Sequence, residues 1–415
     1  MAQSIVPLEL RDMIIDHLHE DKESLHSCAL VHSSWLDSSR HHLFYDFKLK
    51  IQSGPPLHSF LRFIEETPQA ALHISRLTIE GDPSAALCPS DEGNITSTQI
   101  DFLLDHLPRI HTLRLMQVFV TLPTSSILEQ PEDMISRKQY SLRELVFFRI
   151  LGEACVWEGV LGILSLLHTI DKLTIGFGST QLLRTGSQLD EQNELLLAKY
   201  FPRPVIIRNL CLRYAPLLIP KLVAPGVLEM LDIQYGFPFL ENPIIPSIST
   251  LVFESRASLQ HFEYTIPPSF VTDQANFMKL LQHGVHLSYC SHLTSVHLSF
   301  SVTPGFETAN FRLTPYLGVI PTTIEKLPIC IQHLVFHFLA SSNVQQILSD
   351  HFDFERVETA FVSLPALLTV TFDFISTPNE SFYGSRMWHG VNRSGNSLGT
   401  VCESLDCDRS KIEVW

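Results

Sequence analysis

The chain has 415 residues, of which 45% are hydrophobic and 18% are charged, and its net charge is −15. This composition is typical of a folded protein, and the length exceeds what one compact core usually holds, so we expect two structural units or a repeat array. The acidic balance argues against a nucleic-acid partner, which needs clustered Lys and Arg, and against an anionic membrane surface.

The first predicted element is an amphipathic helix that starts near Pro7. Proline suits a first helical turn because its φ is fixed and it has no amide hydrogen to lose. Three apolar residues recur with the spacing of one helix face: Leu10, Ile14 and Leu18. Acidic residues occupy another face: Glu9, Asp12 and Asp16.

Two further short helices are predicted before residue 46. Asp21 is a suitable N-cap for the second helix and Ser33 for the third. Trp35 is placed to hold the three helices together, with Leu10 and Leu25 in the same core. Three helices this short bury little apolar surface, so we expect this segment to depend on its neighbour, on a partner, or on both.

These residues resemble an F-box, the module by which substrate receptors dock onto the adaptor of cullin–RING ubiquitin ligases. The family opens with Leu-Pro-x-Glu, which stands here as Val6-Pro7-Leu8-Glu9. Its central apolar run is Cys28-Ala29-Leu30-Val31, and its closing pair is Leu43-Phe44. The variant is similar to F-box-like proteins of mushroom-forming fungi; Val6 replaces the usual leucine, and Phe44 replaces a tryptophan seen in many members. The alternative is a generic three-helix packing unit.

The resemblance implies a non-enzymatic substrate-recognition subunit of an SCF-type ubiquitin ligase. Residues 1–50 would form the F-box-like domain that binds an SKP-family adaptor protein, and residues 51–415 would bind an unknown target protein. Five residues are expected at the adaptor-binding and motif positions: Pro7, Leu8, Ile14, Leu18 and Val31. The alternative function is a repeat-based interaction scaffold with no ligase role.

Beyond residue 50 one pattern recurs eleven times: apolar, two residues, apolar, one residue, apolar. The copies are 74–79, 110–115, 142–147, 170–175, 207–212, 228–233, 248–253, 259–264, 293–298, 331–336 and 367–372. Because a strand buries alternate side chains, the fourth and sixth positions of each copy should face the core. This pattern is typical of the strand half of a leucine-rich repeat.

Segments compatible with helices separate most copies, at 57–66, 97–107, 158–167, 190–200 and 273–283. Strands that alternate with helices are parallel, so the fold class is α/β: a three-helix F-box followed by an irregular leucine-rich-repeat-like solenoid whose strands line the concave side. An ordinary open α/β sheet is the alternative architecture.

Three segments of the predicted array depart from the regular repeat. Leu251 and Phe262 are only 11 residues apart, which leaves no room for a helix and predicts a hairpin. Residues 384–399 are rich in Gly and Ser and predict a long loop, whereas 411–415 predict a last strand.

No strong motif for catalysis, a cofactor or a metal is present. The chain lacks HExxH and a cysteine pair that could complete a zinc site, so its 20 histidines are interpreted as surface residues. A GxSxG match at 395–399 follows polar residues instead of a buried strand, which leaves a hydrolase with Ser397 as a remote alternative. The eight scattered cysteines and the absence of a secretory pattern in residues 1–20 predict a cytoplasmic or nuclear protein.

The outward positions of the strands are predicted to bind the target protein. They flank the buried fourth and sixth positions and combine aromatic, basic and imidazole side chains, which suit protein recognition. The residues chosen are Phe148, Arg213, His261, His297, His333 and His337. Glu263 and Asp373 are expected on the same surface.

Overall fold

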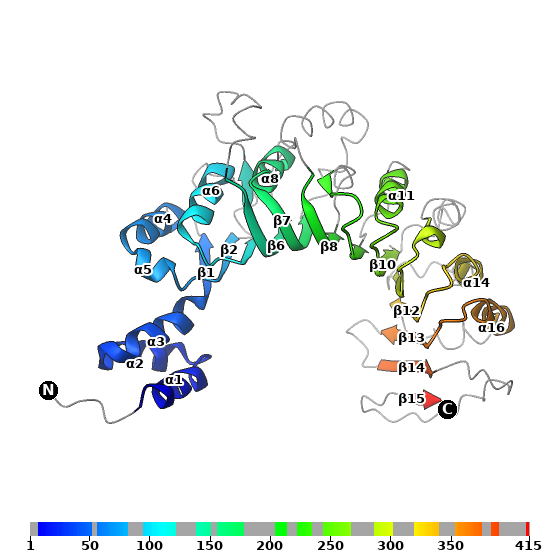
Figure 1. The fold of residues 1–415 in the computed structure, drawn as a ribbon, viewed down its shortest axis with the longest axis horizontal. Helices are drawn as coiled ribbons and strands as arrows, with labels where there is room; N and C mark the ends of the chain where they lie inside the picture. Colours follow the sequence, from blue (N-terminus) through cyan, green and yellow to red (C-terminus); the bar gives the residue numbers. More distant parts are fainter. Residues whose placement is uncertain are drawn as a thin grey trace, which may run out of the picture. The chain divides into compact units, whose positions relative to one another are not determined.

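The computed structural model (Figure 1) divides the chain into two compact units, residues 1–205 and 206–415. It describes residues 7–51, 56–81, 94–121, 138–150, 156–177, 204–213, 222–234, 244–266, 286–301, 319–339, 353–375, 383–389 and 412–414. The predicted helices at 190–200 and 273–283, the GxSxG match and most of the Gly/Ser-rich segment lie outside these residues.

The first unit begins with the three predicted helices: α1 (Leu8–His17), α2 (Lys22–Val31) and α3 (Ser33–Tyr45). Asp21 caps α2 as predicted, because its carboxylate accepts a hydrogen bond of 3.0 Å from the backbone N–H of Ser24. The N-cap of α3 is His32 instead of Ser33. Its ring Nδ1 accepts a 3.1 Å hydrogen bond from the backbone N–H of Ser34, and its extended backbone is the conformation that an N-cap requires.

Helix α1 packs on α3 with the side that carries Ile15, which is fully buried. Two acidic residues of that side contact α3. The Oγ of Ser38 donates a 2.6 Å hydrogen bond to Asp12, and Nε2 of His42 lies 2.8 Å from a carboxylate oxygen of Asp16. The acidic face that the sequence pattern placed apart from the apolar stripe is therefore the one that meets the neighbouring helix.

A parallel sheet follows α3 without a break, so the predicted domain boundary near residue 50 falls inside its first strand. Its strand order is β1-β2-β4-β6-β7. The strands are β1 (Asp46–Ile51), β2 (Arg76–Gly81), β4 (Thr112–Met116), β6 (Tyr140–Ile150) and β7 (Leu167–Phe177). The connections contain α4 (Pro56–Glu66), α5 (Pro68–Ala71), α6 (Ser97–His106), α8 (Val156–Leu164) and a small parallel pair of β3 (Asn94–Thr96) with β5 (Phe119–Thr121).

The second unit repeats this plan with the strand order β8-β9-β10-β11-β12-β13-β14-β15. The strands are β8 (Ile206–Arg213), β9 (Met230–Gln234), β10 (His261–Ile266), β11 (Ser295–Ser301), β12 (His333–Leu339), β13 (Thr369–Ile375), β14 (Tyr383–His389) and β15 (Ile412–Val414). Its helices are α11 (Ile244–Glu254), the 3-10 turn η6 (Leu287–Tyr289), α14 (Val319–Ile324) and α16 (Phe354–Val362). Every pair is parallel except β13 with β14.

The register of the strands explains why apolar residues recur at the fourth and sixth positions of the repeat pattern. In the first unit the fourth positions of successive copies stand opposite one another: Leu77, Leu113, Leu145 and Leu173. In the second unit they are Leu210, Leu231, Phe262, Val296, Leu334 and Val370. These residues and the sixth positions beside them are buried. The prediction that both positions face the core is confirmed for these ten copies; in the eleventh, at 248–253, the sixth position Phe253 is exposed.

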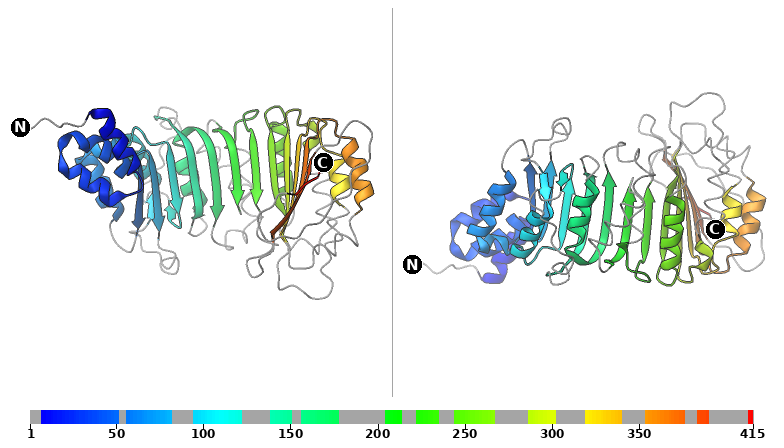
Figure 2. Two further views of the ribbon diagram at one scale, coloured as in Figure 1. Left: turned by 90° about the horizontal axis from the view of Figure 1, so that it is seen from below. Right: turned by 90° about the horizontal axis from the view of Figure 1, so that it is seen from above.

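The helices that connect the strands of each unit lie on one side of its sheet, whereas α1–α3 precede the first strand; the strands are seen directly from the other side (Figures 1 and 2). We call the side opposite the helices the open face. Alternate residues of every strand point to it, because the intervening residues point to the helices.

Two segments that the sequence predicts to be a strand and a loop are different in the structure. The copy at 248–253 lies inside helix α11, which provides the crossover between β9 and β10; these two strands are parallel, so the predicted hairpin is wrong. Its buried residues have helical spacing: Ile248, Leu251 and Val252. The first residues of the predicted loop at 384–399 belong to β14, which pairs antiparallel with β13. The predicted last strand is present as β15.

Candidate functional site

Helix α1 and the end of α2 expose large apolar side chains to solvent. The exposed fractions are 54% for Leu8, 49% for Leu10, 55% for Met13, 43% for Ile14, 75% for Leu30 and 73% for Val31. We call these six residues the N-terminal apolar surface. It is formed because α1 turns Ile15 toward α3, which leaves Leu10 and Ile14 on the side that faces away.

The residues predicted from the F-box resemblance occupy distinct positions in the three helices. Of the predicted adaptor-binding residues, Pro7, Leu8, Ile14 and Val31 are exposed and Leu18 is half-buried. Of the predicted core residues, Leu25 is fully buried and Trp35 is half-buried.

Leu10 was predicted to lie in the core and does not. Leu10 is 49% exposed, and Ile15 takes the place expected for it. A helix this short can turn only one narrow stripe toward its neighbour, and the apolar residues of α1 extend around more of its circumference than that stripe.

Four of the predicted target-binding residues come together on the open face of the second unit. His261 is on β10, His297 on β11, and His333 and His337 on β12. Strand pairing places Glu263 opposite His297, and Ser295 between His261 and His333. We call His261, Glu263, His297, His333 and His337 the histidine face; all five are half-buried.

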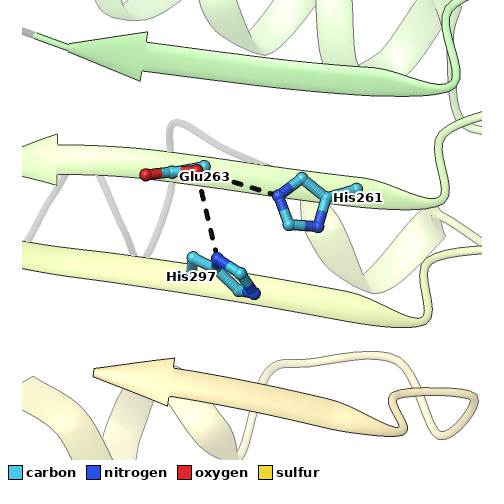
Figure 3. A group of neighbouring side chains, drawn as sticks. All are labelled: His261, Glu263 and His297. Carbon is cyan, nitrogen blue, oxygen red and sulfur yellow. Dashed lines mark ion pairs between the residues drawn. The ribbon is translucent and has the colours of Figure 1, made fainter. Parts of the chain in front are cut away.

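Glu263 stands between two imidazole rings at the centre of the histidine face. Its Oε2 lies 3.9 Å from Nε2 of His261 and 3.9 Å from Nδ1 of His297 (Figure 3). The two rings are 4.5 Å apart at an interplanar angle of 83°. His261 and Glu263 are two residues apart on one strand and therefore point to the same side, and His297 reaches them from the neighbouring strand.

The cluster shifts the pKa of two of its members. The neighbouring His261 is the largest cause that lowers the pKa of Glu263, and it outweighs the opposing effect of burial. Burial, with repulsion from His261 as the next cause, lowers the pKa of His297 to about 4. At neutral pH Glu263 is therefore a carboxylate, and His297 is a neutral imidazole with a free lone pair on one nitrogen.

The two histidines of β12 have partners on β13. Nδ1 of His333 lies 2.8 Å from Oγ1 of Thr369, and Nδ1 of His337 lies 3.2 Å from Oδ2 of Asp373. The ring of His337 is also 6.1 Å from that of His297. These contacts orient both rings on the side of the cluster that lies away from Glu263.

Asp232 on β9 stands opposite Glu263 in the strand register and has no counterpart among the residues predicted from the sequence. Its Oδ2 accepts hydrogen bonds of 3.0 Å from Sγ of Cys211 and 3.1 Å from Nε2 of Gln234. Burial is the largest cause that raises the pKa of Asp232, and the nearby Glu263 carboxylate raises it further. Burial and this hydrogen bond raise the pKa of Cys211 to about 12, so the thiol stays protonated.

The remaining two predicted target-binding residues do not join the histidine face. Arg213 is on β8, opposite Gln234 of β9. Phe148 is on β6 in the first unit and is half-buried beside Arg149, whose guanidinium lies 5.5 Å from the centre of its ring. The open face of the first unit carries cross-strand ion pairs instead, with Lys48 bound to Glu80 at 2.7 Å and Arg114 bound to Glu144 at 2.8 Å.

Comparison with known proteins finds similarity among solved structures only. No protein-family model matches the sequence, and no curated protein matches it. Among solved structures, the leucine-rich repeat-containing protein LegL7 from Legionella pneumophila is similar with a TM-score of 0.38 and 10% identity, over 80% of this chain and 91% of that one. Within the residues that the structure describes, no helix is long and apolar enough to cross a membrane.

Proposed function

We propose that this chain is the substrate-recognition subunit of an SCF-type cullin–RING ubiquitin ligase. In this proposal α1–α3 are an F-box that docks an SKP-family adaptor protein, and the sheet binds the target protein. The observation that carries it is the N-terminal apolar surface, which lies on the segment that resembles an F-box and includes three of the predicted adaptor-binding residues, Leu8, Ile14 and Val31.

The exposure of these side chains has a free-energy cost that a partner would recover. Burial of one Leu, Ile or Val side chain is worth roughly 1.5–3 kcal/mol relative to leaving it in water. Single exposed apolar residues are ordinary on protein surfaces, but six on two short helices are an enrichment that is typical of a protein interface. Helix α1 turns Ile15 and the carboxylates of Asp12 and Asp16 toward α3 and apolar residues away from it, which suits a docking helix.

The open faces of the two units would bind the target protein. The histidine face combines four imidazole rings with the carboxylate of Glu263, and the open face of the first unit combines Arg114, Glu144 and Phe148. Such mixed surfaces suit specific protein recognition. The chain would contribute to ubiquitin transfer by positioning alone, since tethering raises the effective concentration of target lysines without a bond-making residue. This role places the protein in the cytoplasm or nucleus.

A binding measurement with a recombinant SKP-family adaptor tests the proposal. We expect Ile14→Ser and Val31→Ser each to weaken adaptor binding by about tenfold or more, because each loses apolar burial at the interface centre. Both residues are exposed, so the thermal unfolding temperature should stay unchanged. Val362→Ser is the matched control, since Val362 on α16 is 75% exposed and lies outside the helical segment.

Equal adaptor binding by the wild type, Ile14→Ser and Val31→Ser would contradict the F-box role. The alternative function, an interaction scaffold outside any ligase, makes a different prediction in cells. A ligase subunit should copurify with the adaptor and a cullin, and both should be lost in the Ile14→Ser variant. Copurification of other proteins without adaptor and cullin would favour the scaffold.

A further inference from the structure

We propose that His261, Glu263 and His297 form a binding site for one divalent transition-metal ion of the zinc, cobalt or nickel class. Each residue offers one ligand atom, and these three atoms lie within 4.8 Å of one another. Among the described residues, no other group of three His, Cys, Asp or Glu side chains meets this condition. The proposal does not depend on the F-box role of α1–α3.

The distances fit a cation that draws the three side chains together. Ligand bonds of about 2.0–2.1 Å in a tetrahedral site place neighbouring ligand atoms roughly 3.3 Å apart. Nε2 of His261 and Nδ1 of His297 are both 3.9 Å from the same oxygen of Glu263, so small side-chain rotations close the remaining gap. At 3.9 Å these contacts are too long to be hydrogen bonds, and the donor atoms are not committed to one another.

The scaffold holds these three residues with little freedom to separate. His261 and Glu263 share one face of β10 because they are two residues apart, and His297 is the register partner of Glu263 on β11. Phe262, which lies between the two β10 ligands, is fully buried on the opposite face. Metal sites built on paired strands of a sheet are positioned more rigidly than sites on loops.

The charges around the site favour a cation. On the open face of β10 to β13, the described strand positions include the carboxylates of Glu263 and Asp373 and contain no Lys or Arg. A negative surface of this kind raises the local concentration of cations.

The ligand set selects the class of metal. Two imidazoles and one carboxylate suit zinc, cobalt and nickel, whereas magnesium and calcium prefer six or more oxygen ligands. Three protein ligands leave a fourth position of the metal open, and the open face of the sheet gives access to it. Water or a donor atom of a bound molecule would occupy that position.

Isothermal titration of the purified full-length chain with zinc chloride tests the proposal, with magnesium chloride as the hard-cation control. We expect one zinc ion per chain and no comparable magnesium binding. His297→Gln and Glu263→Gln should each weaken zinc binding by about tenfold or more, because each removes one of three ligands. His292→Gln is the matched control, since His292 is exposed and lies outside the histidine face.

Titration with cobalt chloride provides an independent readout. A cobalt ion held by two imidazoles and one carboxylate should give the strong visible absorption of four-coordinate cobalt, and Glu263→Gln should lose it. If a histidine variant fails to fold, Glu263→Gln still tests whether the site binds metal, because glutamine keeps the size and shape of the side chain. Zinc binding that is absent from the wild type, or that survives unchanged in Glu263→Gln, would overturn the site.

Discussion

Within the helical segment of residues 7–45, the fully buried apolar side chains are Ile15 and Leu25, whereas in the repeat strands nearly every fourth and sixth position is buried. The two regions have similar apolar patterns, but they differ in what each residue has to pack against. A strand lies between two neighbouring strands and beneath a layer of helices, so each apolar side chain meets a complementary surface. Helix α1 contacts α3 on one side and meets solvent on the other. The lesson is that an apolar residue in the helical segment is a candidate contact residue, whereas one in a strand is a structural residue.

The largest loss of unfolding free energy should come from truncating a buried side chain of a strand. Phe262→Ala should cost about 4 kcal/mol of unfolding free energy, because Phe262 is fully buried at the fourth position of β10 and its removal leaves a cavity. Urea unfolding followed by circular dichroism measures this loss. Leu368→Ala is the control from the repeat that contains β13; Leu368 is 55% exposed and should cost less than about 0.5 kcal/mol. Similar losses in the two variants would break the distinction between strand core and surface.

A second pair of substitutions sharpens the comparison inside α1. Ile15→Ala should cost about 3 kcal/mol, because Ile15 fills the contact with α3, while Leu10→Ala should cost less than about 0.5 kcal/mol. Differential scanning calorimetry of both variants checks the order. The reverse order would restore Leu10 to the core and remove it from the N-terminal apolar surface.

A smaller effect is expected from the open face of the first unit. Arg114 and Glu144 form a cross-strand ion pair of 2.8 Å that is partly open to water. A double-mutant cycle with Arg114→Ala and Glu144→Ala should give a coupling free energy of about 0.5 kcal/mol, since solvent screens such pairs. The coupling should decrease in 1 M salt. A coupling above about 2 kcal/mol would show that this face is structural and not a solvated surface.

The smallest change in stability should come from the protonation of His73, which lies near His41 of α3. Burial, followed by repulsion from His41, lowers the pKa of His73 below its usual 6.5. The unfolded chain therefore binds a proton more readily than the folded chain, and stability should fall as the pH drops from about 6.5 through the lowered pKa. The loss should be no more than about 0.5 kcal/mol, because the ring is partly exposed.

Thermal unfolding of wild type and His73→Gln at pH 7 and pH 5 measures this contribution. Glutamine does not titrate, so the variant should lose less stability on acidification than the wild type. An equal pH dependence of the two proteins would remove His73 as a source of acid sensitivity.

Much of the fold follows from local patterns. The alternation in each repeat copy predicts which strand residues are buried, because a strand can turn alternate side chains to only two sides. The copy at 248–253 shows the limit of this reasoning. Ile248, Leu251 and Val252 satisfy both the strand pattern and a helical face, so short-range spacing alone cannot distinguish the two. Its position between two parallel strands requires a crossover, and a helix provides one.

The candidate metal site also has one part that local sequence predicts and one part that it does not. The outward direction of His261, Glu263 and His297 follows from the alternation of each strand taken singly, but their meeting depends on the register between β10 and β11. More than 20 residues separate Glu263 from His297, most of them outside the described part of the chain. No spacing rule links them, which is why the sequence shows no metal motif.

Local periodicity thus specifies the three short helices, the buried side of each strand and the parallel alternation of strands with helices, since these properties depend on neighbours within a few residues. Packing between distant segments selects the side of α1 that meets α3 and brings two histidines to one carboxylate. Those choices depend on which surfaces remain unfilled once the chain has folded, and that information is spread over the whole chain.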